Sequence, residues 1–371
     1  MAPVLRIALR RLTRDRRRNI LLAIAVLVSI AMLAFLAEFG LLISVSSGSA
    51  HNGLPFTSFL NRMRLYTYVA VSVIAVMTLL TIRIHCDTHG TENVRTLAVL
   101  TSTGATAWQK GQLIFTEYIV LYMPPLIIGT ALGLPSGAAA ADRFLRATGV
   151  AGTSVNMFAH VVLPALVILI SGALLILACN TVPAIKIRKA PIISAVRSQN
   201  TEEAEIQHGY RQSQTFKKQA LLKRLARESV DYYNNTYGKL ALSFSLSALY
   251  PMLAAVLLWQ LGSVEVILDA NPYDNVTTTA AVMQAIDSMF LFLGVGCAVL
   301  TCVGAAQTLL ILHRQYTARR SASRVYRQIG MPEADTEKMI RLEFQSVLLR
   351  SFIYLIFGAF IIIMMFHITA K

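Results

Sequence analysis

The chain alternates between long apolar runs and shorter polar stretches that are rich in Lys and Arg. An α-helix needs about 20 predominantly apolar residues to cross the hydrocarbon core of a bilayer. We predict seven transmembrane helices, at residues 20–45, 66–86, 112–135, 161–184, 240–262, 288–312 and 343–367. The pattern therefore predicts an all-α membrane protein.

Basic residues are concentrated on one side of the predicted spans. With the N-terminus placed in the cytoplasm, the cytoplasmic segments, together with Arg83 at the inner end of the second span, hold 28 of the 34 Lys and Arg residues. Cytoplasmic loops of membrane proteins carry this excess, so a cytoplasmic N-terminus is predicted. The same distribution accounts for the net charge of +15 and excludes nucleic acid as a partner.

Composition agrees with a membrane protein, because 55% of residues are apolar and 14% are charged, whereas globular domains carry about 25% charge. The outer connections are too short to form a large extracellular domain. The one long polar stretch, 185–239, is predicted to be cytoplasmic. Apolar and basic residues recur at helical spacing over 216–230, which predicts a helix within this linker.

A spacing of 13 residues from Gly to Glu occurs twice, from Gly104 to Glu117 and from Gly330 to Glu343. Each copy follows the second predicted span of one half of the chain and leads into the third. The two copies predict that the chain consists of two parallel pseudo-repeats. We expect a first half of four spans at 1–197, a linker at 198–238 and a second half of three spans at 239–371.

The residues around each repeated glycine predict a short helix, a turn and the start of a new helix. Short cytoplasmic helices are expected at 93–103 and 320–329, each ended by a glycine that adopts a positive φ. Thr106 suits the N-cap of the next helix in the first copy, and Pro332 suits the first turn in the second.

The first copy resembles the signature of the FtsX-like permease family of ABC transporters. The matching residues are Arg95, Leu97, Ala98, Leu100, Gly104, Ala105 and Thr106, with Glu117 on the following helix. In the second half the residues that match loosely are Arg324, Ile329, Gly330 and Glu343. The Arg-rich segment 10–18 and the segment 183–198 resemble the family's entry into the first span and exit from the fourth.

The resemblance implies a permease subunit, in the bacterial plasma membrane, that is driven by two copies of a separate ATPase subunit. A second permease chain is a further candidate partner, and membrane lipid surrounds the spans. The substrate implied is an amphipathic peptide, lipid or lipid-like molecule, as in antimicrobial peptide resistance. The residues expected to couple the ATPase to the permease are Arg95, Leu97, Leu100, Gly104, Arg324, Arg327 and Gly330.

The chain departs from the family pattern in two respects. A complete pair of four-span halves has eight helices, whereas seven are predicted here, so the last helix is either missing, supplied by another chain or not needed. The large outer domain of lipoprotein-extracting and macrolide-exporting relatives is not expected. Mechanisms that rely on such a domain are therefore in doubt for this chain.

Sequence motifs for catalysis are lacking. The chain contains no GxxxxGK[ST], HExxH or GxSxG pattern, so we expect a non-catalytic subunit without a cofactor, with ATP and Mg bound by the partner. A cluster at the inner end of the second span has two histidines four residues apart. Polar residues accumulate at such ends, which favours a structural role over a metal site for His85, Cys86, Asp87 and His89.

Charged residues inside spans are costly and are usually functional. Glu38 lies in the first span, and Arg350 lies in the last span about 10 Å along the helix axis from Glu343. With Glu117, these residues are candidates for a substrate or gating site. Glu343 and Glu38 are the candidate partners of Arg350; the alternatives are a structural pair, a lipid headgroup or extension of Arg350 to the cytoplasmic interface.

Prolines and glycines are predicted to break the third span, at Pro124–Pro125, Gly129, Gly133 and Pro135. The last span contains no proline, so the two halves are expected to differ in structure. Small residues in the sixth span, including Gly294 and Gly296, are expected to allow close packing of helices.

Two other functions compete with an ABC permease. An ion-coupled secondary transporter also contains repeats, but it requires more charge within the spans than this sequence has. A membrane regulator or scaffold that signals through an ATPase would use the same cytoplasmic helices without transport.

Overall fold

The computed structural model of the chain describes residues 8, 12–13, 16–49, 56–102, 104–147, 162–189, 218–232, 234–269, 284, 287, 291–313, 316 and 331–370. No strand occurs in these ranges, which confirms the all-α fold class. The helices are α2 (Arg16–Ser49), α3 (Phe56–Ser102), α4 (Ala107–Ala147), α5 (Leu163–Lys189), α8 (Lys218–Tyr232), α9 (Asn234–Asp269), the helix Leu291–His313 and α11 (Glu333–Ala370).

Six of the described helices are long and apolar enough to cross a membrane, so the protein is a multi-pass membrane protein. These helices coincide with six of the predicted spans. α5 occupies the place of the fourth predicted span, but its described side chains form a shorter apolar stretch, Leu163–Leu174. The predicted total of seven spans therefore stays a prediction.

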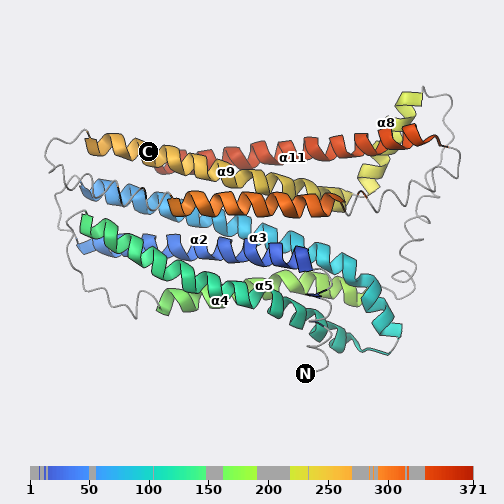
Figure 1. Cartoon of the computed structure of the whole chain (residues 1–371), viewed down its shortest axis with the longest axis horizontal. Helices are drawn as coiled ribbons and strands as arrows, with labels where there is room; N and C mark the ends of the chain where they lie inside the picture. Colours follow the sequence, from blue (N-terminus) through green and yellow to red (C-terminus); the bar gives the residue numbers. More distant parts are fainter. Residues whose placement is uncertain are drawn as a thin grey trace.

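The helices run alternately in opposite directions along the bundle (Figure 1). The beginning of α2, the turn from α3 to α4, helix α8 and the beginning of α11 all lie toward one end. This is the end that the distribution of basic residues assigns to the cytoplasm, and we refer to it as the cytoplasmic end. The segments that the sequence predicted to share one side of the membrane therefore lie at one end of the bundle.

The second predicted span and the short helix expected at 93–103 form a single helix, α3, of 47 residues. The expectation of a separate short helix was wrong. Gly90 is the one helix-weakening residue between the two parts, and a single glycine in a helix costs only about 1 kcal/mol relative to alanine. At 1.5 Å per residue α3 is about 70 Å long, more than twice the thickness of the hydrocarbon core, so it extends well beyond the membrane. The counterpart expected at 320–329 lies outside the described residues.

The third span is likewise continuous, so the prediction that Pro124, Pro125 and Pro135 break it was wrong. All three prolines lie inside α4, which runs without interruption for 41 residues. Transmembrane helices tolerate proline because neighbouring helices and Ser or Thr side chains satisfy the freed carbonyl groups. Nearby hydroxyls also bond to the backbone of α4, since Thr130 and Ser136 donate to the carbonyls of Leu126 (2.7 Å) and Leu132 (2.8 Å).

The glycines of α4 form a packing surface for α2. A Cβ atom at Gly129, Gly133 or Gly137 would lie 2.8, 2.4 or 2.5 Å from a backbone carbonyl oxygen of α2. The oxygens belong to Leu27, Ala31 and Phe35, so both helices contribute one residue every four positions. Small residues at this spacing let two helix backbones approach closely in a membrane.

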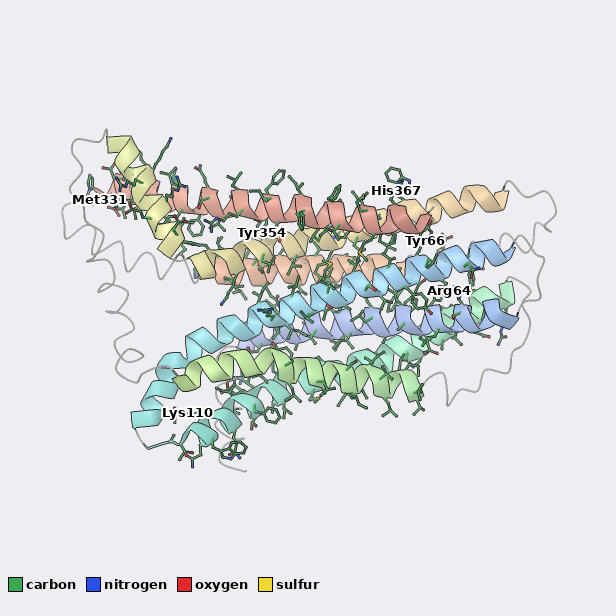
Figure 2. All side chains as sticks on the ribbon, turned by 180° about the vertical axis from the view of Figure 1, so that it is seen from behind. Arg64, Tyr66, Lys110, Met331, Tyr354 and His367 are labelled. Atoms are coloured by element: carbon green, nitrogen blue, oxygen red, sulfur yellow. The ribbon has the colours of Figure 1, made fainter. Side chains whose placement is uncertain are left out.

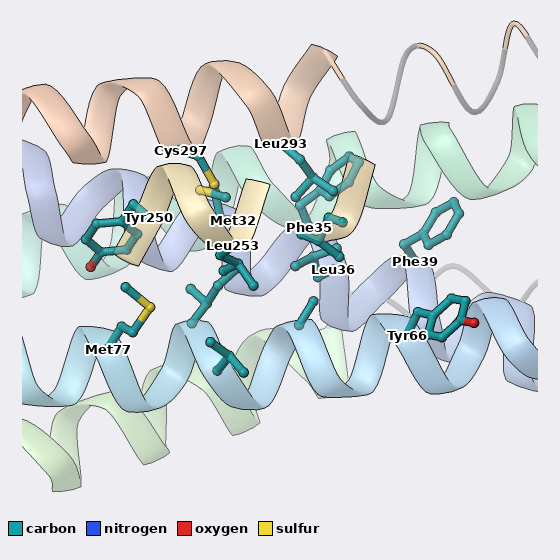
Figure 3. Close-up of a cluster of buried hydrophobic side chains, with 14 of the residues drawn as sticks. Met32, Phe35, Leu36, Phe39, Tyr66, Met77, Tyr250, Leu253, Leu293 and Cys297 are labelled. Atoms are coloured by element: carbon teal, nitrogen blue, oxygen red, sulfur yellow. The ribbon is translucent and has the colours of Figure 1, made fainter. Parts of the chain in front are cut away.

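An apolar core joins the two halves of the chain (Figure 3). The rings of Phe35 in α2 and Phe292 stack with centroids 4.2 Å apart. A Cβ atom at Gly296 would lie 2.5 Å from the sulfur of Met32, so this glycine allows the close packing that the sequence predicted. Further members of the core are Leu36, Tyr66, Met77, Tyr250, Leu253, Leu293 and Cys297.

A Cβ atom built at Gly294, by contrast, would have no neighbour within 4 Å. Gly294 therefore has no role in close packing among the described residues. It provides a matched control for a test of the packing surface formed by Gly129, Gly133 and Gly137.

We expect Gly133→Ala to destabilise the folded protein by about 1–3 kcal/mol, because its methyl group would overlap the carbonyl oxygen of Ala31. Gly294→Ala should leave stability unchanged or raise it, because alanine favours the helix.

Thermal unfolding of the two purified variants in the same detergent measures this difference. Equal unfolding temperatures for Gly133→Ala and the wild-type protein would show that α2 and α4 are not held at this distance.

Candidate functional site: the cytoplasmic elbows

The turn between α3 and α4, residues 100–110, is a well-defined structure that we call the first elbow. Gly104 has φ = 90°, as predicted for the residue that follows the helix. The amide of Ala105 donates to the carbonyl oxygen of Leu100 at 2.9 Å. This six-residue closure is the Schellman motif, which satisfies a carbonyl at the helix end and reverses the chain direction.

The start of α4 is capped within the same elbow. The amide of Gln109 donates to Oγ1 of Thr106 (3.3 Å), and the amide of Thr106 donates to Oε1 of Gln109 (3.0 Å). The predicted N-cap at Thr106 is confirmed. The reciprocal capping box with Gln109 was missed, although the spacing Thr-x-x-Gln is its sequence signature.

Trp108 lies on the outer surface of the first elbow and is 75% exposed. Its neighbour Gln109 is exposed, and Lys110 is partly exposed. A large aromatic side chain exposed on a turn is typical of a protein-binding surface. Figure 2 shows Lys110 and Met331 at the same end of the bundle, with His367, Tyr66 and Arg64 toward the other end.

The second elbow is described from Met331 onward. α11 begins at Glu333, and the carbonyl of Pro332 accepts hydrogen bonds from the amides of Asp335 (3.1 Å) and Thr336 (3.2 Å). Pro332 therefore stands at the helix start, as predicted. Arg324, Arg327 and Gly330 lie outside the described residues, so their predicted coupling role has no structural account.

In the helices that follow the two elbows, side chains at corresponding positions are buried. With Gly104 and Gly330 aligned, Leu113, Glu117 and Leu121 in α4 correspond to Met339, Glu343 and Val347 in α11. All six side chains are buried. Residues four apart share one helix face, so the repeated Gly-to-Glu spacing marks an inward-facing stripe on both helices.

Each stripe is covered by a segment that precedes the first span of its half. In the first half, Ala8 and Leu12 pack in one cluster with Leu113 and Ile114. In the second half, Leu222 and Ala226 of α8 pack with Met339. The two covering segments share the pattern L-[KR]-R-L-x-R-[DE], at Leu9–Asp15 and Leu222–Glu228.

Comparison with protein-family models gives a match to the FtsX-like permease C-terminal domain over residues 65–192. Residues 65–192 are therefore similar to an FtsX-like permease domain. The matched region holds most of α3, the first elbow, α4 and α5. Comparison with curated proteins and with solved structures gave no match.

The predicted coupling residues of the first half lie within the matched permease domain. Gly104 forms the turn, and the carbonyl of Leu100 closes it. Arg95 and Leu97 lie on the last turns of α3, but their side chains lie outside the described set. The structure therefore places these four residues at the end of α3 and in the turn that follows it. Their role in coupling stays a prediction.

The two glutamates of the repeat are buried near the cytoplasmic end of the bundle. Oε2 of Glu343 accepts a hydrogen bond of 2.7 Å from the hydroxyl of Tyr237, at the beginning of α9. Glu117 lies beside Tyr118, whose ring stacks on that of Tyr122 at 5.9 Å. Glu343 therefore links the first and third helices of the second half, a contact that no sequence pattern indicated.

Glu38 lies at the outer end of the glycine surface. It is fully buried, and its carboxylate oxygens have no hydrogen-bond partner among the residues that the structure describes. A Cβ atom built at Gly137 of α4 would lie 3.1 Å from the Cβ atom of Glu38. A buried carboxyl group without a partner is unfavourable, and the role of Glu38 in a substrate or gating site stays a prediction.

Arg350 forms an ion pair that sequence reasoning missed. Its Nη2 lies 3.6 Å from Oδ1 of Asp231, near the C-terminal end of α8. The predicted candidates were Glu343 and Glu38. Because Asp231 belongs to the linker, 119 positions before Arg350 in the chain (350 minus 231), only the docking of α8 on α11 brings these charges together.

No group of three or more metal-ligating side chains occurs among the described residues. The side chains of His85, Cys86, Asp87 and His89 lie outside that set.

The Tyr237–Glu343 hydrogen bond provides a test of the second half. We expect Tyr237→Phe to lower the free energy of unfolding by about 1–3 kcal/mol, because a buried carboxyl loses a donor. Tyr354→Phe is the matched control, since Tyr354 is exposed on α11. Detergent-based unfolding of both variants gives the comparison.

A double-mutant cycle separates this contact from a general packing effect. Glu343→Gln should cost less in the Tyr237→Phe background than in the wild-type protein, because the two residues are coupled. Additive effects would contradict a direct interaction.

Proposed function

We propose that the chain is the permease subunit of an ABC transporter and that separate ATPase subunits dock on its cytoplasmic elbows. The observation that carries this proposal is the first elbow, in which a Schellman turn and a capping box hold an exposed tryptophan at the cytoplasmic end. The sequence contains no phosphate-binding loop of its own. Energy from ATP must therefore come from another chain.

The continuity of α3 supports a coupling role for the elbow. α3 runs from the outer end of the bundle to the first elbow as one helix. Along the way it packs against α9 and α11 of the second half. A displacement of the elbow would therefore be transmitted to the contact between the halves, where a substrate path is expected.

The similarity of the two halves supports the proposal of two ATPase copies. The helices after both elbows bury the same three positions and begin at the same end of the bundle. Since each half presents one such elbow, two docking sites are expected per chain.

The membrane-facing surface supports an amphipathic substrate rather than a small ion. α11 exposes a series of large apolar side chains, including Phe352, Ile353, Phe357 and Phe360. A substrate that resides in the lipid can reach the bundle over this surface. Within the described spans, Glu38 is a fully buried acidic side chain that could meet a cationic group. Export in antimicrobial peptide resistance is one function of this kind.

A membrane regulator that acts through an ATPase is the second candidate. The apolar core between the halves favours it, because buried and mostly apolar side chains fill the described part of the contact. Both candidates require the elbows. They differ in whether Glu38→Gln, which leaves the elbows intact, affects the activity.

The two tryptophans of the chain provide a test of docking. Trp108 lies on the first elbow. Trp259, which is 79% exposed, lies in the C-terminal part of α9, away from the elbows. We expect Trp108→Ala to weaken co-purification with the ATPase encoded beside this chain by about 30-fold, since an interface tryptophan commonly contributes 2 kcal/mol or more. Trp259→Ala should have no effect on co-purification.

Quantitative pull-down from membranes that contain both proteins measures this result. If no neighbouring ATPase is retained by the wild-type chain, or if both variants lose it equally, the first elbow is not the docking site.

A further inference from the structure

Helix α8 carries several exposed basic side chains, and its C-terminal end lies against Arg350. Lys223 and Arg227 are exposed and make no ion pair with a described residue, whereas Arg224 pairs with Glu228 at 3.0 Å. Arg227 precedes Asp231 by four residues, so the two side chains lie one turn apart on the same side of α8. Asp231 in turn pairs with Arg350, while the charge of Arg227 lies one turn away along α8.

This group lies where the surface of α11 changes from polar to apolar. Before Arg350 the exposed side chains of α11 include Glu337, Lys338 and Arg341. From Leu348 onward they are mainly apolar, with Leu348 and Leu349 directly before Arg350. Ile353 and Phe357 follow Arg350 by three and seven residues on the same face. In the same region α8 ends at Tyr232, five residues before the span that begins at Tyr237. The charges therefore lie at the cytoplasmic membrane surface.

A ligand for this corner requires an anionic group next to an apolar chain. The phosphate of a phospholipid headgroup matches the excess positive charge of Arg227 and Arg350, and arginine binds phosphate with paired hydrogen bonds. An acyl chain of the same lipid would lie along Ile353 and Phe357. An acidic side chain of a soluble partner could satisfy the charges, but it would not cover the apolar residues that follow.

We propose that the corner formed by Lys223, Arg227, Asp231 and Arg350 binds an anionic phospholipid of the cytoplasmic leaflet. The bound lipid links α8 to α11 directly above the second elbow. This inference does not depend on the proposed function, because it requires no ATPase and no transported substrate.

Phosphatidylglycerol is the probe for the test, with phosphatidylcholine as the neutral lipid. Native mass spectrometry of the full chain in detergent measures how many molecules of each lipid stay bound. The test variant is Lys223→Gln/Arg227→Gln. Its matched control is Lys338→Gln/Arg341→Gln, which removes the same charge from exposed positions of α11.

We expect the wild-type chain and the control to retain phosphatidylglycerol in preference to phosphatidylcholine. The affinity of the test variant for phosphatidylglycerol should fall on the order of 30-fold, since each basic residue at an anionic surface contributes about a factor of five. Asp231→Asn should have the opposite effect and strengthen binding, because it removes a carboxylate that pairs with Arg350 and competes with the lipid phosphate. This variant keeps the test informative if the double variant folds poorly.

Equal loss of phosphatidylglycerol in the test variant and the control would overturn the proposal in favour of diffuse attraction by positive charge. Unchanged lipid binding with loss of the ATPase in the test variant would also overturn it and would assign the corner to protein docking. Loss of lipid binding with normal ATPase retention supports it.

Discussion

The position of the first elbow depends on the close approach of α2 and α4. In a membrane, apolar side chains gain little by leaving lipid for another helix, so association depends on packing and on contacts between backbones. Gly129, Gly133 and Gly137 supply these contacts, because they bring the backbone of α4 against three carbonyl oxygens of α2. The direction of α4 is thereby fixed, and with it the place where Gly104 and Trp108 meet the cytoplasm.

The second half is held together by different interactions. The one glycine of α11 that closely approaches α9 is Gly358, and it meets the side chain of Leu249 rather than the backbone. Polar contacts at the cytoplasmic end add to this packing: Tyr237 binds Glu343, and Asp231 pairs with Arg350. Polar contacts can be exchanged for water or lipid phosphate more readily than a backbone-to-backbone contact. The two elbows, although similar in plan, should therefore differ in stiffness.

The Gly-to-Glu spacing marks an apolar stripe on α4 and on α11, and each stripe is covered by a segment that precedes the first span of its half. A helix that leaves the membrane at an elbow would expose its apolar stripe to water. In the first half the stripe is buried by residues around Leu12, and in the second by α8. Both segments carry the same basic sequence pattern. In the second copy Leu222 and Ala226 pack against Met339, while Lys223, Arg224 and Arg227 are exposed and can contribute to the electrostatics of the membrane surface.

The sequence by itself determined the apolar spans, the turn at Gly104 and the N-cap at Thr106. These features depend on local composition and on backbone preferences within a few residues, which a single chain segment carries. It also indicated the FtsX-like domain, because the residues that form the elbow are contiguous. The roles of the glycines in α4, the partner of Arg350 and the donor to Glu343 were decided by tertiary structure. Proline and glycine weaken an isolated helix, yet in α4 the neighbouring helix reverses that outcome, and the contacts of Arg350 and Glu343 join residues more than 100 positions apart.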